Sequence, residues 1–176
     1  MKLGMRTLAG LGIAAAMLFA SGCTMMAPPA PKEQYGSSMD SDVDSDQNLV
    51  REQIFRSLLR DHPKEQWVFL SYGQGESGNW SNPTRALVDK LKDLNLKLAP
   101  ASMGNVPRSG AVSVVVHAKT GEPGILYSAK ILKWLDDDIA VVEGTRYKGT
   151  TPKSGFSGTV KRSPDGTWHI DQFKPW

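Results

Sequence analysis

Two strand-like runs joined by an acidic triplet constrain the fold of this chain more than any other feature. The first run spans residues 125–135 and is dense in Ile, Leu, Tyr and Trp, and the second spans residues 139–147 and is rich in Val and Ile. Such residues suit a pleated, half-buried surface, and Asp136, Asp137 and Asp138 suit a solvated turn between the runs. The pattern predicts a central antiparallel hairpin against which the rest of the chain folds.

The first 22 residues read as an export signal. Lys2 and Arg6 precede an apolar run over residues 8–20, which ends in small residues. A run of this length with a basic start is typical of a secretory signal peptide, and it is shorter than the ~20 apolar residues of a membrane span. The pattern predicts that residues 1–22 are removed.

The end of this segment, Ser21, Gly22 and Cys23, resembles the lipobox of bacterial lipoproteins, although Ala20 stands where that family usually has leucine. The resemblance implies that Cys23 becomes the first residue of the mature chain and carries acyl chains such as palmitate. Thr24 in place of Asp favours the outer membrane by the sorting rule of enteric bacteria. The alternative is an ordinary signal peptide that leaves a stray thiol, and a lone cysteine excludes intrachain disulfides.

Composition suggests three parts within the 176 residues: a lipoprotein signal peptide at 1–22, a disordered acylated tether at 23–47 and a single domain at 48–176. The tether is rich in Pro, Ser and Asp, and it has too few apolar residues to offset the entropy of ordering. The domain carries 18 Lys and Arg against 13 Asp and Glu, a net charge near +5. Because this excess is modest and scattered, we expect no nucleic-acid partner.

Local patterns place two helices before most of the strands. The first is predicted from an N-cap at Asn48 to about Arg60, and the second from Pro83 to about Asn95. Strands are predicted at residues 67–72, 111–118, 155–162 and 167–173, with a short edge strand at 96–98. The order predicts an α+β fold, with two N-terminal helices packed on one face of a mostly antiparallel sheet of about five or six strands.

Several short segments resemble a group of exported bacterial proteins of unknown function. They are residues 50–56, 68–73, 120–124, 133–135, 141–144 and 165–168. These segments are strand cores and turns, so the resemblance informs the fold. It carries no catalytic residue over to this chain.

Few residues suggest chemistry. His169 and Asp171 lie two apart on a predicted strand, where an Asp could orient a His as a general base, but a solvated polar row has the same spacing. His117 on another strand is a second candidate of this kind. Metal ligands do not cluster in the sequence, so we expect no metal site and no cofactor.

Four residues are candidates for binding: Trp80 in a glycine-rich loop, Arg51 and Arg56 beside the apolar stripe of the first helix, and Trp176 at the end of the chain. Exposed aromatic and arginine side chains are common anchors of binding sites.

The sequence thus favours a lipid-anchored protein of the cell envelope, facing the periplasm, whose domain is a non-catalytic binding or interaction module. Its membrane contact is the acylated N-terminus, and its partner is another envelope protein or the cell-wall polymer. The alternative is a small periplasmic hydrolase or lyase that uses His169 with Asp171, or His117.

Overall fold

A long antiparallel hairpin forms the frame of the computed structural model, which describes residues 34–36, 45–74, 80–105, 114–149 and 151–176. Its arms are β7 (Pro123–Asp136) and β8 (Ile139–Lys148), paired from Leu126 opposite Tyr147 to Asp136 opposite Ile139. The Asp138 N–H donates to the Asp136 carboxylate at 2.8 Å and closes the turn. The predicted central hairpin is confirmed.

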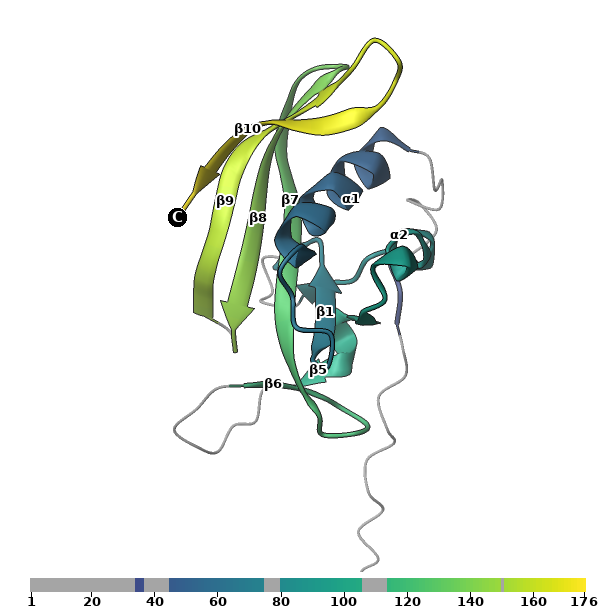
Figure 1. Ribbon diagram of the computed structural model, residues 1–176, viewed down its shortest axis with the longest axis vertical. Helices are drawn as coiled ribbons and strands as arrows, with labels where there is room; N and C mark the ends of the chain where they lie inside the picture. Colours follow the sequence, from purple (N-terminus) through teal and green to yellow (C-terminus); the bar gives the residue numbers. More distant parts are fainter. Residues whose placement is uncertain (1–33, 37–44, 75–79, 106–113, 150) are drawn as a thin grey trace, which may run out of the picture.

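Eight strands join in one sheet in the order β10-β9-β8-β7-β1-β4, with β6 paired to β7 and β5 paired to β6 (Figure 1). A separate pair is formed by β2 and β3. The remaining helices and strands of the described residues are α1 (Asp46–Leu59), β1 (Trp67–Ser71), β2 (Gly73–Gln74), β3 (Trp80–Ser81), α2 (Arg85–Lys90), β4 (Lys97–Pro100), β5 (Gly104–Asn105), β6 (Val115–His117), β9 (Thr151–Arg162) and β10 (Trp168–Pro175).

The predicted fold class, two N-terminal helices on a mostly antiparallel sheet of five or six strands, is wrong. The sheet has eight strands, and β1 pairs in parallel with both β4 and β7. The pair β1 and β4 is joined through α2, a crossover that parallel neighbours require. The second predicted helix is only six residues long, because its last turn tightens at Leu91 into a 3-10 turn and Asn95 takes a left-handed conformation with φ of 54°.

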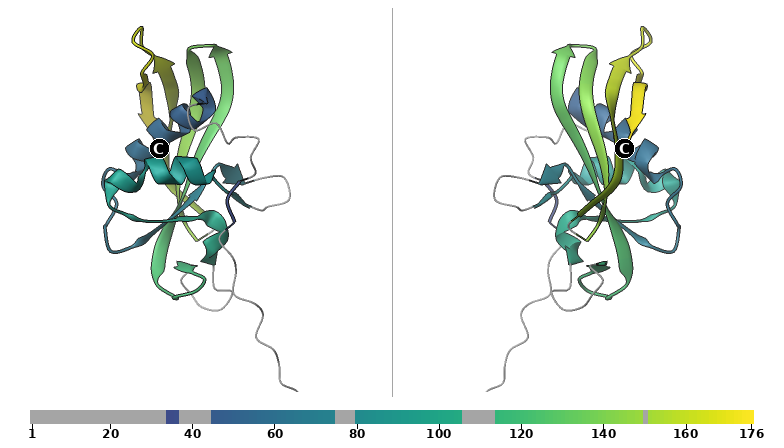
Figure 2. Two further views of the ribbon diagram at one scale, coloured as in Figure 1. Left: turned by 90° about the vertical axis from the view of Figure 1, so that its right-hand side faces the viewer. Right: turned by 90° about the vertical axis from the view of Figure 1, so that its left-hand side faces the viewer.

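The long helix α1 lies across one face of the sheet, as Figures 1 and 2 show. Ser45, and not the predicted Asn48, caps it by accepting the Asn48 N–H at 3.4 Å. The helix packs mainly on β7, β8 and β10, where it buries Val50, Ile54, Phe55 and Leu59. A buried phenylalanine such as Phe55 contributes about 2–3 kcal/mol. This core contains Val50, Ile54, Phe55, Leu87, Leu91, Tyr127, Val142, Phe156, Val160 and Trp168.

A second core covers the other face of the sheet near β1 and the start of β7. Its buried members are Phe69, Ala99, Ala101, Met103, Val115, Leu126 and Tyr147. Strand β1 is therefore covered on both faces, which is the usual environment of parallel strands. Burial on both faces explains why the sequence of β1 is a near-continuous apolar run.

Several predictions concern residues at the start of the chain. The signal peptide at 1–22 and Cys23 lie outside the described residues. Of the predicted tether, residues 34–36 contact the domain, since Tyr35 packs on the first core and the Gly36 N–H donates to the Pro83 carbonyl at 2.9 Å. These three residues belong with the domain in the structure.

Candidate functional site

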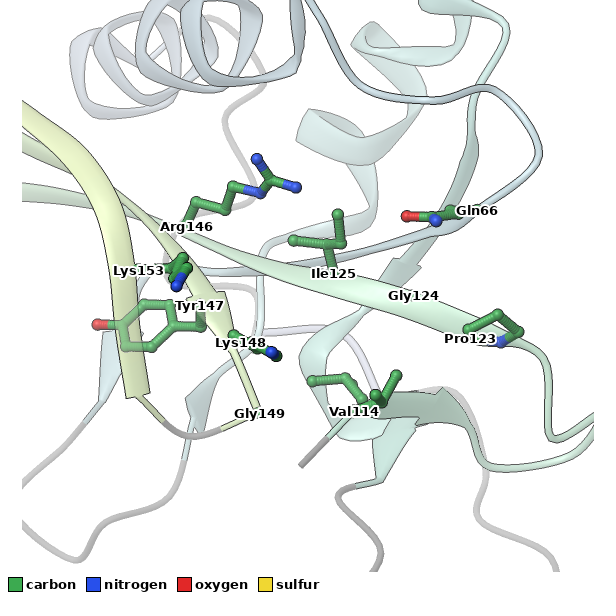
Figure 3. A pocket seen from close by; sticks show the side chains of 11 residues that line it. Gln66, Val114, Pro123, Gly124, Ile125, Arg146, Tyr147, Lys148, Gly149 and Lys153 are labelled. Carbon is green, nitrogen blue, oxygen red and sulfur yellow. The ribbon is translucent and has the colours of Figure 1, made fainter. Parts of the chain in front are cut away.

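The sheet has a break along one edge of β7. On one edge of β7, Gly124 pairs with Trp67 of β1. On the opposite edge of β7, Gly124 pairs with Val115 of β6, and β8 pairs along the same edge. Strand β8 ends at Lys148 and β6 begins at Val115, so the two follow each other along β7, with Ile125 at the junction. The pocket in Figure 3, of about 320 Å³, opens at this junction.

The floor of this pocket is apolar and its rim is basic, and we call it the basic pocket. Val114, Val115, Pro123, Gly124 and Ile125 supply most of the floor. Gly124 is required here, because a Cβ would lie 2.5 Å from the Phe69 ring and 2.7 Å from the Trp67 carbonyl oxygen. The backbone of β7 can therefore approach the second core closely.

Three cations come from the end of β8 and the start of β9: Arg146, Lys148 and Lys153. Among the described lining residues there is no Asp or Glu, and none of the three cations forms an ion pair with a described carboxylate. Three cations beside a concave apolar surface create a positive potential that attracts an anionic group. The arrangement suits a ligand with a negative charge and an apolar part.

A buried histidine supports one side of the basic pocket. His62 Nδ1 lies 2.9 Å from the Tyr127 hydroxyl, and Nε2 lies 3.2 Å from the carbonyl oxygen of Gln66, which lines the basic pocket. Since the carbonyl only accepts, Nε2 carries the proton and Nδ1 accepts from Tyr127. Burial lowers the pKa of His62 below its ordinary value, and the positive charge of Arg146 lowers it further against the raising effect of the Gln66 bond. The ring is therefore a neutral support.

A second cavity, of about 260 Å³, lies between the C-terminal part of α1 and the end of β10. We call it the aromatic groove, and it shares Arg146 with the basic pocket. Tyr127 stands directly opposite Arg146 in the register of β7 and β8, so the two side chains share a face of the sheet. The aromatic groove is lined by Ser57, Leu58, Asp61, Tyr127, Arg146, Ser154, Gly155, Phe156, Phe173, Pro175 and Trp176.

Of the four predicted binding residues, the structure places Trp176 alone in one of these two cavities. Trp80 is half-buried and packs edge-on to Tyr147, with 4.8 Å between ring centroids. The Arg51 guanidinium lies 3.9 Å from the centre of the Tyr72 ring. Arg56 contacts Glu52, at 2.8 Å. Each of Trp80, Arg51 and Arg56 thus has contacts within the fold, and none of the three lines either cavity. Their roles in binding stay predictions.

The three histidines lie in separate parts of the structure. His117 is buried on β6 and stacks on Trp67 with 4.1 Å between ring centroids. His169 is exposed on β10, with Nδ1 3.0 Å from the Ser163 hydroxyl. Asp171 falls in a register shift of β10, and its carboxylate lies 3.5 Å from the Thr159 hydroxyl. The contacts of His169 and Asp171 are with these hydroxyls, and no contact between the two is found within the described part of the chain.

Sequence reasoning missed the cations of the basic pocket and Phe173 of the aromatic groove. Arg146 and Lys148 are two apart at the end of a predicted strand, a spacing that places both on one face. This spacing indicates that the two side chains share a face of the sheet. It does not indicate that β6 begins beside the end of β8.

No protein-family model matches this chain, and neither a curated protein nor a solved structure matches it. Within the described ranges, no helix is long and apolar enough to span a membrane. Those ranges also contain no group of three His, Cys, Asp or Glu side chains that could hold a metal ion.

Proposed function

We propose that this chain is a lipid-anchored binding protein of the bacterial cell envelope, whose basic pocket holds an anionic group of an envelope polymer or lipid. The cluster of Arg146, Lys148 and Lys153, none of which forms an ion pair with a carboxylate of the described residues, carries this proposal. Three cations close together repel one another, and a bound anion offsets this repulsion. The lipobox-like segment at Cys23 supports the anchor.

The basic pocket fits two sources of negative charge in the envelope. Carboxylates of the cell-wall polymer and phosphates of lipid headgroups both form charge-assisted hydrogen bonds with arginine and lysine. The acylated full chain in neutral detergent is therefore tested in two arms. In one arm it is sedimented with purified cell-wall sacculi, and in the other it is floated with phosphatidylglycerol or with neutral phosphatidylcholine vesicles. The neutral vesicles measure what the acyl anchor binds by itself.

The variant for both arms is the triple replacement Arg146→Gln, Lys148→Gln and Lys153→Gln. We expect the triple variant to bind at least about tenfold more weakly to whichever material the wild type binds, sacculi or anionic vesicles. Each lost charge-assisted hydrogen bond contributes ~1.5–3 kcal/mol, and less where solvent screens it. Added salt should weaken the wild type in the same direction.

A matched control removes three exposed lysines elsewhere, Lys64→Gln, Lys119→Gln and Lys161→Gln, and changes the net charge equally. The proposal fails if the control weakens binding as much as the pocket variant does, or if the wild type binds neither sacculi nor anionic vesicles. The anchor is tested separately: Cys23→Ala should move the protein out of the membrane fraction of cells.

A further inference from the structure

We infer that the aromatic groove is a saccharide subsite and that the ligand is an acidic saccharide, whose sugar ring lies on Trp176 and Phe173 while its carboxylate reaches Arg146. The inference rests in part on the proposed function, because Arg146 belongs to both cavities. It goes further by naming the class of ligand and a second set of contacts.

The two rings are exposed and yet held in place. Trp176 is 51% exposed, but its backbone N–H and carbonyl both bond to Gly155, at 3.0 and 3.2 Å. A Cβ at position 155 would lie 2.6 Å from Cζ2 of the indole, so the indole packs closely on the backbone of Gly155 because that residue has no side chain. Phe173 is 54% exposed and stacks on the buried Phe156 with 4.6 Å between centroids. Two apolar rings are thus ordered without being covered.

Polar groups surround these rings in the aromatic groove. Ser57 and Ser154 offer hydroxyls, Asp61 offers a carboxylate and Arg146 offers a guanidinium. A sugar ring has polarised C–H bonds on its faces and hydroxyls around its edge. The negative face of an aromatic ring attracts the former, and the surrounding polar groups satisfy the latter. An apolar helix or chain would leave Asp61 and Arg146 to be desolvated without partners.

Charge favours an acidic saccharide over a neutral one. Arg146, which stands opposite Tyr127 in the register of β7 and β8, lines the aromatic groove, and Lys148 and Lys153 extend the positive charge into the basic pocket. A carboxylate at this position gains a charge-assisted hydrogen bond. One of the two sugars of the bacterial cell-wall glycan carries such a carboxylate, which is free to ionise where the stem peptide has been removed from it. Peptide-free glycan of the cell wall is therefore the source that this inference selects.

The test follows the indole N–H of Trp176 by NMR in the labelled, acylated full chain. The probes are a neutral disaccharide of two N-acetylglucosamine units and the acidic disaccharide of N-acetylglucosamine and N-acetylmuramic acid. We expect both to shift this signal, with the acidic probe binding about tenfold more tightly. Arg146→Gln should make the two affinities equal.

The Trp176 variants lack the indole signal and are followed through the backbone amide of Gly155, which lines the aromatic groove. Trp176→Ala should weaken both probes by about tenfold, the loss expected for a removed aromatic contact, and Trp176→Phe should retain most of the binding. The matched control is Trp134→Ala, which removes another partly exposed indole outside the aromatic groove. If Trp134→Ala weakens the probes as much as Trp176→Ala, the subsite is not where we place it.

Failure of this inference and failure of the proposed function give different results. If neither saccharide shifts the Trp176 signal while sacculi binding still depends on the three cations, the saccharide subsite is refuted and the basic pocket stands. A shift caused by an apolar peptide and by no saccharide would refute it in the same way. If sacculi and anionic vesicles both fail to bind, the proposed function is refuted, and the neutral disaccharide still decides for or against the aromatic groove.

Discussion

Arg56 gives the sharpest test of how this fold is held together. Its Nε lies 2.8 Å from the Glu52 carboxylate, Nη1 lies 2.9 Å from the Asp93 carboxylate, and Nη2 donates to the Lys90 carbonyl at 3.0 Å. One side chain thereby connects the last turn of α1 to the segment that ends α2. Its hydrogen bond to Asp93 is the main cause of the raised pKa of Arg56. We predict that Arg56→Ala lowers stability and leaves ligand binding unchanged.

The magnitude follows from the separate contacts. The bond to the Lys90 carbonyl contributes ~1 kcal/mol. The pair with Glu52, four residues earlier on the helix, contributes ~0.3–0.5 kcal/mol. Packing of the half-buried side-chain stem adds ~0.5 kcal/mol. The Asp93 carboxylate is exposed, so we assign no energy to it, and the expected loss is ~2 kcal/mol.

Urea unfolding of the full chain, followed by tryptophan fluorescence, measures this loss. With a denaturant slope of ~1–3 kcal/mol per molar, the midpoint should fall by about 0.7–2 M. Arg56→Lys should lose an intermediate amount, because one ammonium group cannot reach three acceptors in the planar geometry of a guanidinium. Arg60→Ala, at an exposed position just after the same helix, should leave the midpoint almost unchanged.

The reasoning is refuted if Arg56→Ala unfolds at the wild-type midpoint. A variant of wild-type stability that binds sacculi more weakly would instead make Arg56 a binding residue, as the sequence suggested.

Three further predictions concern other parts of the fold. Because burial lowers the pKa of His62, the unfolded chain binds more protons than the folded one below about pH 6.5. The free energy of unfolding should therefore fall between about pH 7 and about pH 5, by at most ~1.4 kcal/mol per pH unit from this group. Urea titrations at both pH values measure the fall, and His62→Gln should flatten the pH dependence. Gly158→Ala places a Cβ against the Gln172 carbonyl oxygen, so we expect a loss of ~1–3 kcal/mol and faster hydrogen exchange along β10. His117→Ala removes the ring stacked on Trp67 and should cost ~2–3 kcal/mol in thermal unfolding.

Each of these has an opposite outcome. A His62→Gln variant with the wild-type pH dependence would assign that dependence to another group. Unchanged exchange in Gly158→Ala would mean that β9 and β10 can separate slightly at no cost. A thermally unaltered His117→Ala variant would show that the stacked ring contributes nothing net.

Elements predicted from short, local patterns agree best with the structure. The density of β-branched, aromatic and other apolar residues at 125–135 and 139–147 is a property of neighbouring residues, and the hairpin needs only a short turn to form. The apolar stripe of α1 likewise appears over 14 consecutive residues. The cap was missed by three positions, because Ser45 and Asn48 are both good capping residues and only the path of the chain selects between them.

The parallel pairings of β1 could not be derived in this way. Strand β4 has four residues, ends in Pro100 and shows no strong alternation, so nothing local identifies its partner. Residues 148–154 lie between the predicted strands at 139–147 and 155–162, and in the structure they contain the end of β8 and the start of β9. Their lysines therefore lie on the rim of the basic pocket rather than in a loop.

The sequence alone determined the central hairpin with its acidic turn and the first helix, since backbone propensity and side-chain periodicity act over a few residues. Tertiary structure alone decided that β6 follows β8 along the edge of β7, which opens the basic pocket, and that Trp176 rests on Gly155 beside the end of α1. These contacts join segments far apart in the chain. Which partners meet depends on the surface that the whole fold can bury and on the entropy of closing the intervening loops.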